Sequence, residues 1–434
     1  MFTATKLNTS ILTGLHLTVD GLCACCVFML TPLLGASHAL LLFVAYNVLA
    51  FLSQPFVGLW VDKTHSPRTV FNTAISLLTG GALASIISCA IPQHAAIPLL
   101  PYTATLLFGM GNALFHVYGG KSVAVQTGND MRHLGVFVSS GAIGLVLGEL
   151  LTSTIGLTLL VLCMVVLSFL LGKVEHTMPD LPTATKRHQP TSPTFTPLFL
   201  FVLLIVFIRS FIGKMLPAYE DNATYMALLF GVLAFVGKWA GGFLGKKWGT
   251  GTILTITLLA SGVCFLLSGM HLAFGLAMTL SINLTMPLTL YLANQQMPHH
   301  EGFAFGMLAA MLIPGTALGT VCSCWPLATP LLYALIATIV IEATVLLAIG
   351  EQRWQVLGMS LVMNVLTNLP LNIFLLSHPT LHTSLSAQIL LECGVVAVES
   401  LLYLLVLHNG RKAFCYAMLC NAISYLIGLL YTYL

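Results

Sequence analysis

Ionisable side chains that interrupt long apolar stretches are the residues of this sequence best suited to chemistry. His16 and Asp20 are four residues apart in the first such stretch, so a helix would place them on one face. If that helix crosses a membrane, a charge at its centre costs roughly 2.5–3.5 kcal/mol, and such groups usually have a function. The pair is suited to exchanging a proton as water access changes. A structural hydrogen bond to a neighbouring helix is the alternative, and the presence of two ionisable groups favours proton exchange.

Two further charged residues lie inside later apolar stretches. Glu149 is a candidate proton site or the partner of a cation, and the sequence leaves both open. Arg209 is central in its stretch, and its planar guanidinium suits a carboxylate, phosphate or phosphonate. We expect Arg209 to bind an anionic substrate, with pairing to Asp20 or Glu149 as the alternative. Lys214 and Lys238 are expected to extend toward the membrane surface.

Other polar residues in apolar stretches are weaker candidates for lining a cavity. His116 is a candidate substrate contact, although a lone histidine there more often makes a hydrogen bond at a helix end. Asn283 and Glu342 are candidates because burying a polar group is costly. Glu392 and Glu399 are seven residues apart near the C-terminus, which favours a small bundle with the carboxylates on one face. The asparagines expected to satisfy them are Asn364, Asn368, Asn372 and Asn421.

Cysteines are gathered in two places. Cys23, Cys25 and Cys26 lie in the first apolar stretch, and Cys322 and Cys324 end the eleventh at the same membrane face. Thiolates bind soft metals. However, successive residues on a helix point in different directions, and cysteine is also a common apolar residue. We therefore expect no metal site and no cofactor, and keep these five cysteines as weak metal-ligand candidates.

Fifteen apolar stretches are long enough to cross a membrane as helices, which needs about 20 residues each. With 58% hydrophobic and 7% charged residues, the composition differs from that of a soluble domain. The sequence therefore predicts an all-α integral membrane protein. The predicted spans are 8–30, 38–60, 69–91, 98–120, 134–153, 154–172, 197–217, 224–245, 251–271, 273–297, 301–322, 328–350, 357–377, 385–407 and 413–433.

Lysine and arginine occur in alternate loops only. This positive-inside pattern places the N-terminus in the cytoplasm and, with an odd number of spans, the C-terminus outside. The net charge of +3 is dispersed, which suits lipid headgroups and not nucleic acid. We expect a multi-pass protein of the inner or plasma membrane whose first span is retained, because that span is too long for a signal peptide. The basic residues of the inner loops are Lys6, Lys63, Arg68, Lys121, Arg132, Lys173, Lys186, Arg187, Lys246, Lys247, Arg353, Arg411 and Lys412.

A polar segment rich in Pro and Thr divides the spans. Residues 173–196 follow the sixth span and are expected to form a cytoplasmic linker. Six spans precede it and six follow it, and a short polar stretch at 350–356 separates three more. We therefore expect two six-helix bundles, 1–172 and 197–350, and a three-helix appendage, 351–434, that docks on the bundles or on a protein partner.

Two six-helix bundles joined by a cytoplasmic linker resemble the major facilitator superfamily. After the second span, the run from Gly58 to Arg68 is similar to the superfamily's loop signature, with His65 where the family usually has Gly. Residues 242–249 hold the matching place after the eighth span, without the Asp, as an internal repeat requires. The resemblance implies a gating loop at the inner face. Its residues are Gly58, Asp62, Lys63 and Arg68.

Shorter motifs resemble one branch, the fosmidomycin-resistance-like drug exporters. That branch has a His and an Asp four apart in the first span, as His16 and Asp20 are, and a Gly-x-Gly-x-Ala-x-Phe-His run close to Gly109 to His116. The glycines before Glu149 are similar to the exporter signature of the fifth span, although Glu149 replaces the usual Pro. The resemblance covers residues 8–350 and leaves the last three spans unmatched.

The resemblance implies a secondary transporter that works by alternating access. Together with the charged residues, it favours a proton-coupled antiporter that exports a small organic anion or drug-like compound. The alternatives are a soft-metal transporter that uses the cysteines, and a non-transporting scaffold or receptor. An enzyme is not expected, because no His-Glu-x-x-His or Gly-x-Ser-x-Gly motif occurs. The residues expected to carry the proton are His16, Asp20 and Glu149, and those expected to bind substrate are Arg209, His116 and Asn283.

Overall fold

The described part of the chain is helical. In this computed structural model, no β-strand occurs among the residues described. This confirms the expected all-α membrane fold. The described residues are 2–64, 66–91, 99–177, 193, 195–216, 223–323, 328–351, 353–378 and 384–433.

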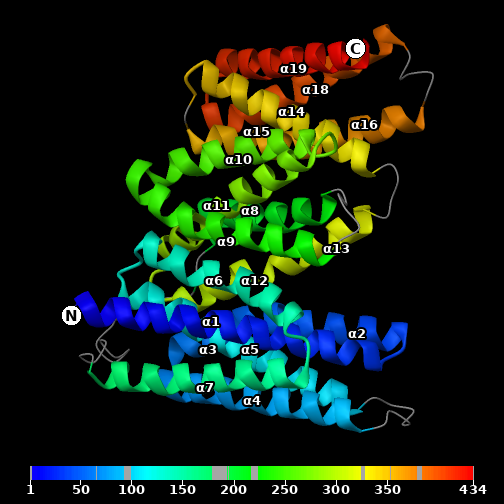
Figure 1. The fold of residues 1–434 in the computed structure, drawn as a ribbon. Coiled ribbons are helices and arrows are strands. Elements are labelled where there is room, and N and C mark those ends of the chain that lie inside the picture. The colour runs from blue at the N-terminus through cyan, green and yellow to red at the C-terminus, as the bar shows by residue number, and fades with distance from the viewer. Residues whose placement is uncertain are drawn as a thin grey trace. The chain divides into compact units, whose positions relative to one another are not determined.

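Most predicted spans are a single helix, whose ends differ from the prediction by a turn or two at most (Figure 1). A short 3₁₀ turn, η1 (Thr31–Leu33), extends the first of them. The single helices are α1 (Phe2–Leu30), α4 (Pro67–Ala90), α5 (Leu99–Gln126), α6 (Met131–Leu150), α7 (Thr154–Thr177), α8 (Pro197–Met215), α9 (Ala223–Trp248), α10 (Thr250–Leu267), α11 (Leu272–Gln296), α14 (Ala328–Ala348), α18 (Leu385–Leu407) and α19 (Gly410–Tyr433).

Three predicted spans are interrupted within their length. In the last of them the break falls at Thr367, shortly before Pro370, which cannot donate a backbone hydrogen bond to the preceding turn. The interrupted spans are α2 (Ala36–Asn47), the π-helical turn η2 (Val48–Leu52) and α3 (Gln54–Lys63); α12 (Glu301–Ala310) and α13 (Leu312–Ser323); and α15 (Trp354–Leu366) and α16 (Asn368–Ser377).

Thirteen helical segments of the described chain are long and apolar enough to cross a membrane. Helices α5 and α19 are not among them. Helix α5 carries Asn112, His116 and Lys121 together with several glycines, which lower its hydropathy, and most of its residues are buried inside the protein. The expected fifteen spans and their orientation therefore stay predictions.

The chain divides into two compact units. Unit 1 contains Met1–Lys214, Ala218–Thr257 and Thr279–Gly319, and unit 2 contains Met215–Pro217, Leu258–Met278 and Thr320–Leu434. Unit 1 thus holds α1 to α9 and α12, with the first part of α10 and most of α11 and α13. Unit 2 holds α14, α15, α16, α18 and α19, with the remaining parts of α10, α11 and α13. The predicted bundle boundaries, at the linker and at residue 350, stay predictions.

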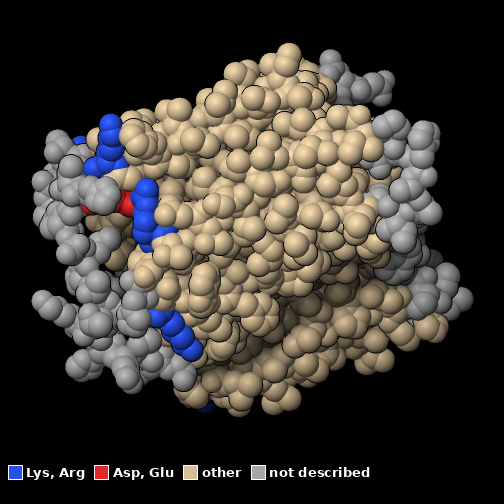
Figure 2. Space-filling view, turned by 90° about the horizontal axis from the view of Figure 1, so that it is seen from below, with Lys and Arg blue, Asp and Glu red and all other residues tan. Residues whose placement is uncertain are grey.

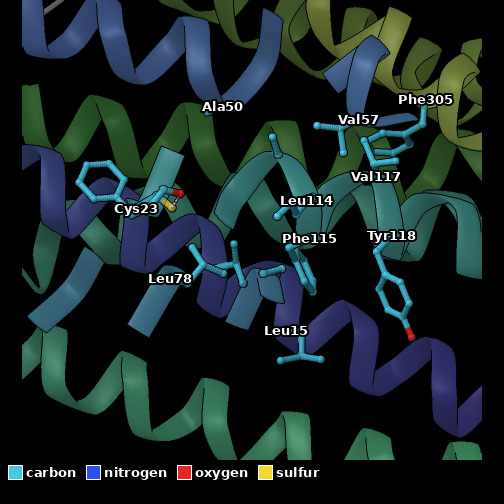
Figure 3. Close-up of a cluster of buried hydrophobic side chains, with 14 of the residues drawn as sticks. Leu15, Cys23, Ala50, Val57, Leu78, Leu114, Phe115, Val117, Tyr118 and Phe305 are labelled. Carbon is cyan, nitrogen blue, oxygen red and sulfur yellow. Dashed lines mark hydrogen bonds between the residues drawn. The ribbon is translucent and has the colours of Figure 1, made fainter. Parts of the chain in front are cut away.

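The core of unit 1 is built around α5. Leu114 and Phe115 of α5 belong to one buried cluster with Leu15 of α1 and Leu78 of α4 (Figure 3). Lipid tails are as apolar as these side chains, so close packing and not the hydrophobic effect holds such helices together. Helix α5 is therefore well placed to present polar side chains to the interior of unit 1.

Glycines allow α6 to approach α1 closely. A Cβ atom at Gly144 would overlap the backbone carbonyl of Leu17, and one at Gly148 would overlap that of Gly21. Small residues commonly let membrane helices pack backbone to backbone in this way. Gly141, Gly144 and Gly148, the glycines before Glu149, therefore all face α1.

Lysine and arginine side chains gather at one end of the helices on the face seen in Figure 2, and the rest of the described surface in that view shows none. Basic residues in alternate loops predict such a distribution, because alternate loops lie on the same side of the membrane. The end of unit 1 that carries Lys63, Arg68 and Lys121 is called the basic end below.

Candidate functional site

Three buried side chains from two helices meet in unit 1. Asp20 of α1 lies between His16 of the same helix and His116 of α5. His16 Nε2 is 3.2 Å from Asp20 Oδ2, and His116 Nε2 is 3.2 Å from Asp20 Oδ1. All three residues are at most 9% exposed. The predicted pair is therefore part of a triad. Within the described residues, it is the one group of three His, Cys, Asp or Glu side chains whose ligand atoms are close enough together that they could hold a metal ion.

Hydrogen bonds on the far side of each imidazole determine which ring nitrogen carries its first proton. His16 Nδ1 is 2.7 Å from the carbonyl oxygen of Phe137, and His116 Nδ1 is 2.9 Å from that of Asn112. A carbonyl only accepts, so each Nδ1 donates, and each Nε2 then carries hydrogen only when its ring is charged. An ionised carboxylate also only accepts. Both contacts to Asp20 are therefore hydrogen bonds only when the triad holds two exchangeable protons.

Helix α6 encloses the triad from a third direction. The ring of Phe137 stacks on that of His16 with centroids 4.6 Å apart. A Cβ atom at Gly141 would overlap Asp20 Oδ2 and lie 2.8 Å from His16 Nε2. The triad therefore depends on a glycine of α6 for its space, and a movement of α6 against α1 would disturb it.

Arg209 of α8 is buried and has no acidic partner among the residues that the structure describes. It is 9% exposed, and its Nη1 makes no hydrogen bond to any residue that the structure describes. Neither Asp20 nor Glu149 forms an ion pair with it in the described chain. A buried, unpaired guanidinium is costly, so a counter-charge is expected at this place during function.

Lys238 of α9 lies in the same region. Its charge interacts with those of Arg209, Asp20 and His116. Lys238 is half-buried, and the expectation that it extends toward the membrane surface stays a prediction. Helix α9 packs on α6 here: a Cβ atom at Gly135 would lie 2.9 Å from the backbone oxygen of Lys238.

The structure also places the other predicted substrate and proton residues, Asn283 and Glu149. Asn283 of α11 packs beside Gly237, next to Lys238, and its Nδ2 donates to the carbonyl of Thr279 in its own helix at 2.8 Å. Glu149 is in the last turn of α6, roughly 12 Å along the helix from the glycine beside Asp20. It forms no ion pair with another described residue.

Asp62 joins α3 to the start of α12 at the basic end. Its Oδ1 accepts from the backbone amide of Gly302 at 3.0 Å, and its Oδ2 accepts from that of Phe303 at 2.8 Å. First-turn amides have no partner inside their own helix, and a carboxylate there is favoured by the helix dipole. Lys121 Nζ lies 3.0 Å from Asp62 Oδ1 and donates to the carbonyl of Val61 at 2.9 Å. We call this arrangement the latch.

Glycines bring the helices of the latch into contact. A Cβ atom at Gly58 would overlap the carbonyl of Gly302, and one at Gly306 would overlap the backbone of Gln54. Helices α3 and α12 thus touch backbone to backbone, as small residues four apart permit. Helix α13, the other half of the same span, packs on α8 instead, where Gly315 meets the carbonyl of Phe207.

The other two predicted gating residues lie outside the latch. Lys63 is exposed. Arg68 forms an ion pair with Glu175 of α7, so it ties α4 to α7. Of the four predicted gating residues, Gly58 and Asp62 are the two that contact α12.

The cysteines of α1 point to different neighbours. Cys23 Sγ contacts the carbonyl oxygen of Phe108 at 3.8 Å, and Cys25 Sγ contacts that of Leu151 at 3.4 Å. All three thiols from Cys23 to Cys26 are buried. Cys322 is half-buried in α13, and Cys324 lies outside the described residues.

Several residues of the candidate site were not assigned to it from the sequence. Lys238 was visible as a charge inside a predicted span, so its burial cost was a signal that could have found it. Gly302 belongs to a Gly-x-x-x-Gly pattern that predicts close helix packing. Phe137 and Lys121 gave no signal, because their roles depend on residues distant in sequence.

Comparison with known proteins agrees with this fold. The sequence matches the Major Facilitator Superfamily over residues 24–320. No curated protein matches it. A variant of the E. coli fucose:proton symporter FucP is similar in structure, with 14% identity, a TM-score of 0.56, and coverage of 76% of this chain and 96% of that chain. A bacterial homologue of the iron transporter ferroportin, in an outward-facing state with soaked iron, shares 16% identity with a TM-score of 0.51 over 76% of this chain and 98% of that chain.

The fold and the match define a multi-pass membrane transporter and not an enzyme. The chain belongs to the Major Facilitator Superfamily. It is a secondary transporter that works by alternating access, as expected from the sequence. The narrower resemblance to the fosmidomycin-resistance branch stays a prediction, and the match ends before α14.

Proposed function

We propose that this protein transports a small organic anion together with protons. The observation that carries the proposal is Arg209, a guanidinium in the interior of unit 1 with no acidic partner among the residues described. Taking such a charge out of water costs several kcal/mol unless a counter-charge compensates for it. An anionic substrate supplies that counter-charge during part of the transport cycle.

The cations around the site define the class of anion. The planar guanidinium of Arg209 binds two oxygens of one carboxylate, phosphate or phosphonate side by side. Lys238 adds a second positive charge close by. Asp20 is already bonded to two histidines, so these two cations are left for the substrate. A compact anion with one or two negative charges fits best.

The triad of His16, Asp20 and His116 is the proposed proton carrier. When it gains two protons, its net charge changes from −1 to +1 by counting one carboxylate and two imidazoles. Lys238 interacts with both the triad and Arg209, so it connects the two sites electrostatically. A positive triad strengthens anion binding and a negative one weakens it.

The electrostatics favour co-transport over exchange. Because protons and anion attract each other, they are carried in the same direction, and an inward proton gradient drives uptake. This differs from the antiport and export that the resemblance to drug exporters implies, and the direction of flux in the experiment below decides between them. The latch of Asp62 on α12 must open when the site faces the basic end.

A second candidate function is transport of a divalent transition-metal ion through the same triad. Two imidazole nitrogens and one carboxylate suit such ions, and both rings donate their other N–H to a backbone carbonyl, as metal-bound histidines usually do. The fold of the iron-soaked ferroportin homologue is similar, although at 16% identity this concerns the fold alone. The neighbouring charges of Arg209 and Lys238 disfavour a cation, so we prefer the anion.

Flux into proteoliposomes tests the proposal. We expect an inward proton gradient to drive uptake of at least one member of a panel of carboxylates, phosphates and phosphonates. Arg209→Gln removes charge-assisted hydrogen bonds worth about 1.5–3 kcal/mol, so the apparent affinity should fall roughly 10- to 100-fold. Arg209→Lys should lie between, because it keeps the charge and loses the fork.

Lys214→Gln is the matched control, because Lys214 is an exposed cation of the same helix. It should leave uptake unchanged. Flux of Mn²⁺, Fe²⁺ or Zn²⁺ that is lost in His116→Gln and survives in Arg209→Gln would replace the anion by a metal. If no cargo moves in wild-type protein, the scaffold alternative is favoured.

A further inference from the structure

A second buried polar cluster lies in unit 2. This unit has its own apolar core, which includes Leu346, Met363 and Tyr403. Glu342 of α14 and Glu399 of α18 lie within it, and both are 0% exposed. Neither carboxylate forms an ion pair with a cationic side chain in the described parts of unit 2. Two carboxylates inside a membrane unit therefore lack an evident counter-charge.

Within the described parts of the chain, only neutral groups donate hydrogen bonds to these carboxylates. Each carboxylate accepts two, which fixes its position and leaves its charge uncompensated. The sequence predicted asparagine partners, and two of the four expected asparagines, Asn364 and Asn421, donate to the carboxylates. The donors are Ser360 Oγ (2.9 Å) and Asn364 Nδ2 (2.6 Å) to Glu342, and Thr367 Oγ1 (2.7 Å) and Asn421 Nδ2 (2.5 Å) to Glu399.

The two carboxylates accept hydrogen bonds from neighbouring turns of the span formed by α15 and α16. Asn364 bonds Glu342 and Thr367 bonds Glu399, and these two donors are one helical turn apart, about 5 Å along the axis. The charges of Glu342 and Glu399 interact with each other. Two like charges near each other in a low-dielectric interior are unfavourable, and either a proton on one of them or a cation between them removes the repulsion.

Unbonded oxygen atoms in the cluster point to a ligand. Glu342 Oε1 and Asn421 Oδ1 are buried and form no hydrogen bond with any described group. The hydroxyl of Tyr403 is also buried, and it lies near Ser360 and Cys420 without a hydrogen bond of normal geometry to a described group. Tyr403 is close enough to interact with both carboxylates. Buried oxygens left without a partner are costly. All of these atoms are oxygens, which is the ligand set of hard cations.

The helix that crosses this cluster is interrupted there. Helix α15 ends at Leu366 and α16 begins at Asn368, with Thr367 between them. Pro370 has no amide hydrogen to donate to the carbonyl of Leu366. Within a membrane, such freed backbone carbonyls are tolerated where they are satisfied by the protein, by water or by a bound ion.

We propose that unit 2 binds a hard cation, a sodium or alkaline-earth ion, between Glu342 and Glu399. Asn421 and Tyr403 supply further oxygen ligands. The ion neutralises the two carboxylates and joins α14, α15, α18 and α19. All of its ligands belong to unit 2, so the proposal does not depend on the anion site of unit 1.

Thermal unfolding of the full-length protein in detergent tests this site. Na⁺, Ca²⁺ and Mg²⁺ are titrated separately against choline chloride at constant ionic strength. We expect one of them to raise the unfolding temperature of wild-type protein in a saturable way. Glu342→Gln and Glu399→Gln should each weaken its apparent affinity at least tenfold, and Tyr403→Phe, which removes one oxygen and keeps the ring, severalfold.

Glu351→Gln is the control, because Glu351 belongs to the same unit and is bonded to Arg353 instead of the cluster. It should keep the cation response. Tyr403→Phe keeps the test decisive if the glutamate variants fail to fold. A wild-type protein that none of the three cations stabilises over choline would overturn the proposal, as would an affinity unchanged in Tyr403→Phe and in every glutamate variant that folds.

Discussion

A buried charge must find a partner, and the kind of partner distinguishes the charged residues of this protein. Asp62 is bonded to two helix amides and a lysine, which suits a contact that forms and breaks as a unit. Asp20 is shared by two imidazoles, which suits proton exchange. Arg209 has no partner in the described chain, which suits a substrate. Glu342 and Glu399 have neutral donors only, which suits a bound cation.

The sequence predicts local pairs well and distant ones poorly at this scale. His16 and Asp20 could be paired in advance because a helix places residues four apart on one face. The second imidazole of the triad comes from α5, and nothing in the sequence gives the distance between α1 and α5. The partner of Asp62 could not be predicted for the same reason. It is the backbone at the start of α12, which is distant in the sequence.

An ion pair between spans predicts a pH dependence of stability. Hydrogen bonds from Arg353 lower the pKa of the Glu351 carboxyl from its usual 4.5 to about 2. A carboxyl with a lowered folded-state pKa stabilises the fold above pH 4.5, and this contribution is lost as the pH falls through about 2. The unfolding temperature of Glu351→Gln should therefore depend less on pH than that of wild type between these values. Equal slopes in thermal unfolding experiments would contradict this assignment.

At the scale of elements, the latch makes a prediction about α12. Asp62→Ala removes the acceptor of two first-turn amides, so hydrogen exchange at Gly302 and Phe303 should accelerate roughly tenfold or more, given about 1–3 kcal/mol for a buried group left unbonded. Exchange is measured by mass spectrometry on peptides that cover 301–310. Lys63→Ala changes the neighbouring exposed residue and should have no effect. Equal exchange in both variants would mean that Asp62 does not hold α12.

The contact of α6 with α1 makes a second prediction. In Gly141→Ala, the new methyl group meets the carboxylate of Asp20 and the ring of His16, so the triad must shift. We expect a loss of stability of about 1–3 kcal/mol, typical of overpacking, and loss of proton-coupled flux. Gly80→Ala is the control, because its methyl would lie 3.7 Å from Leu107 Cδ1, an ordinary contact. Normal flux in Gly141→Ala would show that the geometry of the triad is unimportant.

For the whole molecule, hydropathy was enough to predict the helices, and the linker with the loop signature from Gly58 to Arg68 was needed for the superfamily. Apolar length and basic loop residues are properties of single segments, so they can be recognised in the sequence without knowing how the helices pack. The interruptions at η2 and between α12 and α13 were not predicted, because both halves of each span remain apolar. They matter, since α12 packs on α3 while α13 packs on α8.

The central claim is that the triad carries protons together with an anion. The most direct test records the internal pH of proteoliposomes with an enclosed dye while a transported anion is added outside. Wild-type protein should acidify the interior as the anion enters, and Asp20→Asn should bind the anion but move no protons. Acidification that persists in Asp20→Asn would contradict the account, and so would a rise of internal pH on anion entry, which would indicate exchange.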